Sequence, residues 1–180
     1  MRAVTTAVRT ARPGRAAIAA LGAVLAAAAV AGCPGPVPAE ETSGTTETAL
    51  VGRYVGGWDV EGLLSEPAIA AELEALTGNA LAELERNLDV NAGVEYYGSA
   101  LAVSGNAPHR GGEEEAIVCI QPTAPPKVHA GIHSRGRITV YTREARYEFL
   151  PTCVKDWITQ VNSGHADRMR APANVHLVRP

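Results

Sequence analysis

The hydrophobic pattern of the chain changes its period near Asn91, and this change limits the possible folds more than any other feature. Before it, apolar side chains recur at helical spacing, as at Ile69, Leu73 and Leu76, which would share one helix face. After it, short β-branched or aromatic runs are separated by Gly, Pro and Ser, a pattern typical of strands. Helices followed by strands predict an α+β domain.

Start and stop signals divide the helical block. Asp59 is expected to cap a short helix that begins at Val60. A second helix is expected between Pro67 and Gly78, because proline favours the first turn and glycine marks a stop. The leucine spacing over residues 80–88 predicts a third helix.

The second block predicts a meander of strands, a helix and a tail. Strands are expected over residues 94–103, 115–121, 127–133 and 137–142, with a terminal strand at 175–178. In the third of these, His129 and His133 alternate with apolar residues and should face away from them. A helix should follow Pro151 and end at Gly164. The predicted fold is a single antiparallel β-sheet of about five strands with helices packed on one face.

The N-terminus predicts the compartment. Four arginines precede an alanine-rich apolar run over residues 16–31, which suits the h-region of a secretory signal better than a membrane span. The run ends in Val30-Ala31-Gly32-Cys33, which resembles the lipobox of bacterial lipoproteins. We therefore expect a lipoprotein signal peptide at 1–32 and a lipidated Cys33 that anchors the protein in the bacterial envelope. The alternative is a buried alanine helix with a chance cysteine.

The expected boundaries follow from composition. Residues 33–48 lack large apolar side chains and predict a disordered tether. Residues 49–164 are long enough for one domain with its own core, and residues 165–180 form a polar C-terminal tail.

Loss of the signal peptide would make the chain, whose net charge is −3, more acidic. Of 16 basic residues four precede Cys33, whereas all 19 acidic residues follow it, so the remainder carries 12 − 19 = −7. This charge argues against nucleic acid and favours a cationic partner, through steering more than through affinity.

Two cysteines remain after Cys33. Outside the cytoplasm Cys119 and Cys153 are expected to form a disulfide. Both also lie in apolar strings where a buried free thiol is at home, so that alternative stays open.

No constellation predicts an enzyme. His129 and His133 would be about 13 Å apart on a strand, too far to share a metal ion. There is no Gly-x-Ser-x-Gly sequence and no glycine-rich phosphate loop. The run Glu113-Glu114-Glu115 follows a glycine pair and is typical of a solvated strand entry. We therefore expect no cofactor and no catalytic residue.

A loop between two expected strands is the candidate binding element. It runs from Gly105 to Gly112, with a Pro-His dipeptide at its crest. Loops held by a rigid sheet often carry binding residues, although such a sequence is also typical of a polar turn. The candidate residues are Gly105, Asn106, Ala107, Pro108, His109, Arg110 and Gly111.

The order of elements from about Tyr54 to Gly164 resembles the inhibitor of vertebrate lysozyme family. Those proteins are periplasmic α+β proteins whose protruding loop reads Cys-Lys-Pro-His-Asp-Cys and is closed by a disulfide. Here Pro108 and His109 match, whereas Asn106 and Gly111 stand where the cysteines would be.

The resemblance implies a binding role. In the family, the loop enters the substrate cleft of lysozyme, and its histidine hydrogen-bonds the catalytic carboxylates. By this analogy Pro108 and His109 would bind a lysozyme or another cell-wall hydrolase. Two alternatives are an envelope assembly lipoprotein that binds another protein, and a small hydrolase that uses His109 with Glu113 or Glu114.

Overall fold

The computed structural model describes residues 42–163 and 170–180 of the 180-residue chain. Its helical elements are α1 (Thr42–Tyr54), α2 (Val60–Leu64), α3 (Pro67–Thr77), the 3-10 turn η1 (Gly78–Ala80), α4 (Leu81–Arg86), the 3-10 turn η2 (Tyr147–Phe149) and α5 (Thr152–Val161). Its strands are β1 (Val90–Asn91), β2 (Glu95–Tyr96), β3 (Leu101–Asn106), β4 (Glu114–Gln121), β5 (Lys127–Ser134), β6 (Arg137–Tyr141) and β7 (Val175–Val178).

The N-terminal helices begin where local signals place them. The Asp59 carboxylate accepts a hydrogen bond from Gly62 N at 3.0 Å and caps α2. Pro67 occupies the first turn of α3, which ends before Gly78. These starts and stops agree with the sequence prediction, because each depends on backbone donors and dihedrals within a few residues.

Helix α1 was not predicted from the sequence. It starts at Thr42, inside the range 33–48 expected to be a tether. Leu50 and Val51 pack against the core, and the buried Tyr54 hydroxyl donates to Glu66 Oε1 at 2.6 Å. These C-terminal anchors explain a helix in a segment whose own composition did not indicate one. Residues 33–41 lie outside the described residues.

The strands form one seven-stranded sheet in the order β1-β3-β4-β5-β6-β7, with β2 also paired to β3. Pairing is antiparallel from β1 to β6, whereas β7 runs parallel to β6. The prediction of a purely antiparallel sheet of about five strands was therefore wrong. The chain crosses from β6 to β7 through α5, and a crossover of that kind returns the chain parallel to the strand it left.

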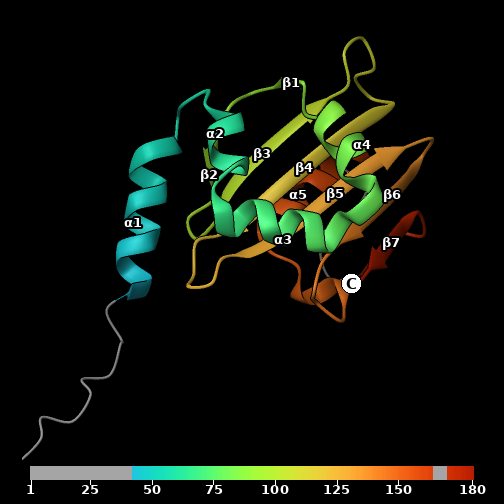
Figure 1. Ribbon diagram of the computed structural model, residues 1–180. Coiled ribbons are helices and arrows are strands. Elements are labelled where there is room, and N and C mark those ends of the chain that lie inside the picture. Colours follow the sequence, from blue (N-terminus) through green and yellow to red (C-terminus); the bar gives the residue numbers. More distant parts are fainter. Residues whose placement is uncertain (1–41, 164–169) are drawn as a thin grey trace, which may run out of the picture. The chain divides into compact units, whose positions relative to one another are not determined.

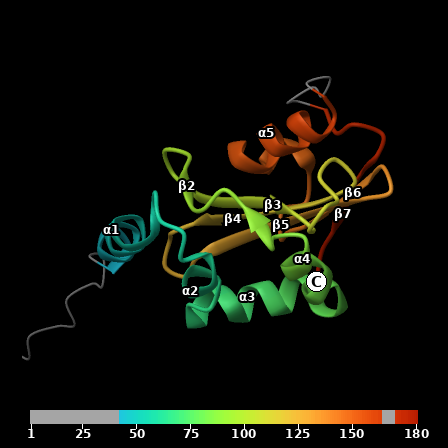
Figure 2. The ribbon, with the colours of Figure 1, turned by 90° about the horizontal axis from the view of Figure 1, so that it is seen from above.

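Helices cover both faces of the sheet (Figure 2). On one face, leucines of α2–α4 pack on Val118, Ala130 and their neighbours in one apolar core. On the other face, Trp157 and Ile158 of α5 pack on Ile117, Cys119 and Val140. The prediction of helices on one face was therefore wrong. The sequence did indicate that both faces are covered. Residues 116–120 of β4 are all apolar, and a strand that is apolar at every position is buried on both faces.

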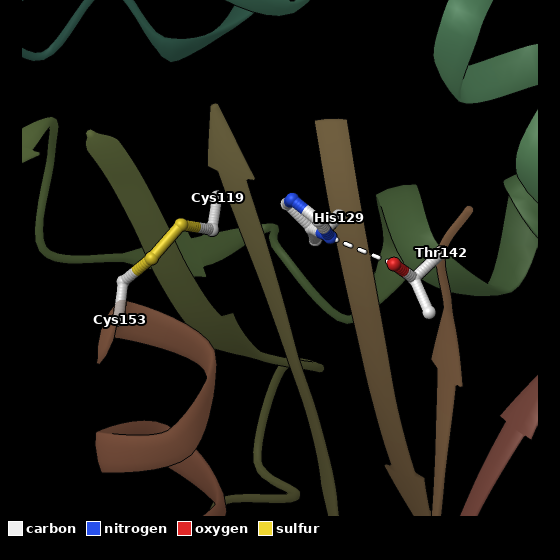
Figure 3. Close-up of a disulfide and its surroundings, with 4 residues drawn as sticks. All are labelled: Cys119, His129, Thr142 and Cys153. Carbon is white, nitrogen blue, oxygen red and sulfur yellow. Dashed lines mark hydrogen bonds between the residues drawn. A yellow bond between two sulfur atoms is a disulfide. The ribbon is translucent and has the colours of Figure 1, made fainter. Parts of the chain in front are cut away.

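A disulfide joins Cys119 of β4 to Cys153 at the start of α5, with their Cα atoms 6.3 Å apart (Figure 3). The predicted pairing is confirmed. It ties the α5 layer covalently to the centre of the sheet, across a sequence separation of 34 residues.

Candidate functional site

The connection between β3 and β4 projects beyond the end of the sheet (Figure 1). It carries the predicted binding residues Ala107 to Gly111, whereas the predicted Gly105 and Asn106 are the last two residues of strand β3. Ala107 is buried and holds the base of the loop, whereas Pro108, His109, Arg110 and Gly111 are exposed. The sheet thus presents a short polar tip with an imidazole at its crest.

The crest is a tight turn. Arg110 N donates to Ala107 O at 3.0 Å, which places Pro108 and His109 at the two central positions. Proline suits the first of these, while the second requires a positive φ in a type II turn, and His109 has a φ of 62°. Glycine or asparagine is usual there, so a histidine in this conformation costs roughly 1 kcal/mol of backbone strain. Backbone strain at an exposed residue that does not contribute to core packing is typical of a binding residue.

Charged side chains brace the loop. Arg110 Nη2 contacts Glu113 Oε2 at 3.1 Å and Glu114 Oε1 at 3.0 Å, and Arg86 Nη2 of α4 contacts the other oxygen of Glu114 at 3.0 Å. Ala107 N also donates to Glu114 O at 3.0 Å, and closes the hairpin. Because Glu113 and Glu114 pair with arginines and His109 has no hydrogen bond within residues 42–163 and 170–180, the hydrolase alternative lacks its dyad.

The positions of the family's two cysteines are neighbours. A Cβ built on Gly111 would lie 3.8 Å from the Asn106 side-chain carbon Cγ, so residues 106 and 111 face each other across the loop base. Asn106 Nδ2 instead donates to Ala107 O at 2.8 Å. Position 105 requires glycine, because a Cβ there would lie 2.6 Å from Val90 O of the paired strand β1. Hydrogen bonds and ion pairs therefore hold the loop in place of a disulfide.

A hollow lies beside the loop. Its volume is about 380 Å³, and it lies between the β3–β4 loop and the turn that joins β5 to β6. Arg110, Glu113, Glu114, His133 and Arg135 contribute to its wall. His133 is only 7 % exposed, and among the described residues its Nδ1 has no hydrogen-bond partner.

The second strand histidine, His129, is buried at the other end of β5. It lies on the α5 face beside the disulfide, opposite to Val128 and Ala130, as the alternation predicted (Figure 3). Its Nδ1 is hydrogen-bonded to Thr142 Oγ1 at 2.8 Å. Burial lowers the pKa of this imidazole from 6.5 to about 4; Lys127 adds to the lowering and Glu72 opposes it.

This depressed pKa predicts acid sensitivity. The unfolded chain binds a proton at His129 near pH 6.5, whereas the folded chain binds it only near pH 4. The free energy of unfolding should therefore fall by about 3 kcal/mol as pH drops through this window, and level off below it. Urea unfolding between pH 7 and pH 3.5 measures this. His129→Gln should flatten the dependence, and an equal slope in both proteins would contradict the assignment.

Several residues outside the loop were either predicted to have a role or overlooked in the sequence. Cys33 lies outside the described residues. Within those residues, no group of three or more His, Cys, Asp or Glu side chains is arranged to hold a metal ion, and no helix has the length and apolar character needed to cross a membrane. Sequence reasoning missed Arg86, which braces the loop from α4, and the exposed Trp58. Arg86 gave no local signal, because its partner Glu114 is 28 residues away.

The fold and site define a class: an α+β domain that presents a braced loop at the end of a sheet covered by helices on both faces. The family model for inhibitor of vertebrate lysozyme (Ivy) matches residues 68–164, and the chain belongs to this family. The match covers α3 through α5 and includes the whole loop. Because the family is one of inhibitors, the protein is not an enzyme. No curated protein and no solved structure matches the chain.

Proposed function

We propose that this protein inhibits a lysozyme by placing the Pro108–His109 tip in the substrate cleft of its target. The family match supports a lysozyme-type protein partner and action in the bacterial periplasm or envelope. The observation that carries the binding mode is the crest itself: His109 is exposed, strained at a φ of 62°, and mounted on a closed hairpin.

The chemistry of the tip suits a cleft that contains carboxylates. A protonated imidazole donates from both ring nitrogens, and acidic neighbours favour that form. Hydrogen bonds to charged groups contribute about 1.5–3 kcal/mol each. His109 would thus occupy the place of substrate atoms between two acidic side chains, while Pro108 restricts the backbone before binding and reduces the entropy lost on association.

Anchoring belongs to the same proposal. The arginine-rich leader, the apolar run and Val30-Ala31-Gly32-Cys33 support lipidation of Cys33. A chain tethered in this way would hold the inhibitor close to the cell wall, where an invading lysozyme acts.

The decisive experiment is an inhibition titration of protein that begins after Cys33, against a c-type and a g-type lysozyme. Wild type should inhibit with one-to-one stoichiometry, and His109→Ala should weaken inhibition by at least about 10- to 100-fold, the equivalent of losing one of the two charge-assisted hydrogen bonds. His109→Gly should lose inhibition equally while unfolding at the same or a higher temperature, because glycine relieves the positive φ.

The exposed His176 of β7 provides the matched control, and His176→Ala should inhibit as wild type does. Absence of inhibition by wild type at tens of micromolar would refute the function. Full inhibition by His109→Ala would refute the binding mode.

A further inference from the structure

A second surface with the properties of a binding site lies on the opposite side of the domain from α5. It is a groove of about 740 Å³ bounded by α2, α3 and α4. Leu64 and Leu81 line it as half-buried side chains, over the buried Leu73, Leu84 and Leu88. An open hollow with a leucine floor offers a site for an apolar side chain to leave water.

An exposed tryptophan stands at the edge of this groove. Trp58 is 75 % exposed, the most exposed large apolar side chain within residues 47–163 and 170–180. Its backbone is fixed, because Gly56 N donates to Val94 O at 2.9 Å and Val94 N donates to Gly57 O at 3.0 Å. Gly93 lies beside the ring, since a Cβ there would be in ordinary contact with Trp58 Cδ2 at 3.6 Å. An exposed tryptophan on a fixed backbone contributes little to the fold, and its large ring can anchor a partner.

The rim of the groove is acidic. Glu61, Glu85 and Asp89 line it and are exposed, and no lysine or arginine of residues 42–163 or 170–180 lines it. In the part of the chain that the structure describes, none of these three carboxylates forms an ion pair. By contrast, the nearby Glu66 and Glu72 are neutralised by Arg53 and Arg143. The groove therefore presents a rim of exposed carboxylates without ion pairs among the described residues, around an apolar floor.

We propose that this groove binds a cationic segment of a protein partner that carries an apolar anchor residue. The anchor would enter the leucine floor, and lysine or arginine side chains would pair with Glu61, Glu85 and Asp89. A further cation can stack on the Trp58 ring. The leucine floor distinguishes this occupant from a glycan, because its aliphatic side chains offer no hydrogen-bond partners to sugar hydroxyls.

The groove is a separate contact from the loop but a close neighbour of it. Asn91 lies at one end of the groove and pairs in β1 with Gly105, at the base of the loop. One basic partner can therefore engage both elements. Binding at the groove does not require that the loop inhibit any enzyme, so the two proposals are tested independently.

The test uses a synthetic amphipathic peptide of leucine and lysine, with a peptide in which glutamate replaces every lysine as the control probe. Binding to the domain is followed by Trp58 fluorescence and by calorimetry at low and physiological salt. The other tryptophan, Trp157, is 5 % exposed and provides a constant background. The lysine peptide should bind one-to-one, and the glutamate peptide should not bind.

Variants locate the site. Two changes in the groove should each weaken binding of the lysine peptide at least tenfold: Trp58→Ala, and Glu85→Lys combined with Asp89→Lys. The pair Glu74→Lys with Glu144→Lys makes the same change in net charge outside the groove and should weaken it less than threefold. If both pairs of substitutions lowered the affinity for the lysine peptide equally, binding would depend only on the net charge of the domain, and the proposal would be overturned. So would unchanged binding by Trp58→Ala, or displacement of the peptide by a soluble chito-oligosaccharide.

Discussion

Replacement of both Cys119 and Cys153 by alanine is expected to lower the free energy of unfolding by about 4 kcal/mol. The disulfide closes a loop of roughly 35 residues, and the loss of that constraint increases the entropy of the unfolded chain by about this amount. Both cysteines are buried, at 0 % and 1 % exposure, so the smaller side chains also lose some packing. For a domain with a total stability of about 5–15 kcal/mol, this is a large fraction.

Guanidinium unfolding of the oxidised protein and of the double variant measures the difference. Wild-type protein unfolded in the presence of a reductant is the control, and it should lose nearly as much stability as the variant. The loop lies between β3 and β4, away from the Cys119–Cys153 link, so the folded fraction of the variant should inhibit as wild type does. A loss below 1 kcal/mol would mean that the packing of α5 alone holds this layer.

Gly131→Val should destabilise the domain by about 3 kcal/mol. Gly131 lies in the middle of β5 and faces α5, where a Cβ would lie 2.7 Å from Trp157 Cζ3 and 2.9 Å from Ile117 Cγ2. Valine has a high strand propensity, yet its branches would push the indole and the helix away from the sheet. Thermal unfolding and the near-ultraviolet signal of Trp157 report the change.

The control for this substitution is Gly52→Ala. Gly52 lies in α1, and within the described residues no atom outside its own turn of the helix lies within 4 Å of a Cβ placed there. Alanine has the higher helix propensity, so this change should be neutral or stabilise by up to about 1 kcal/mol. A tolerated Gly131→Val would mean that α5 does not approach the sheet as closely as these distances indicate.

Sequence reasoning succeeded for features set by neighbours in the chain. Asp59, Pro67 and Gly78 marked helix boundaries because a cap or a stop depends on a few consecutive backbone groups. The loop was found for the same reason, since Pro108 and the flanking glycines act through local dihedrals. It was not evident that His109 adopts a positive φ, because that depends on closure of the turn by the hairpin around it.

The arrangement of the layers of the domain became evident only from the tertiary structure. Placement of α5 on the second face of the sheet is set by Trp157 packing against Gly131 and by the Cys119–Cys153 link, which are contacts between distant segments. The parallel pairing of β7 follows from the path of the same helix. The Trp58 groove likewise arises only when α2, α3 and α4 come together.

By itself the sequence determined the α+β class, most element positions, the cysteine pair and the loop with its histidine, because periodicity, caps and turns are local properties. The resemblance in that loop pointed to the family to which the chain belongs. Only the tertiary structure decided which faces are covered, how β7 pairs, what braces the loop and where a second groove opens. Those features depend on contacts between residues far apart in the chain, whose pairing no local pattern encodes.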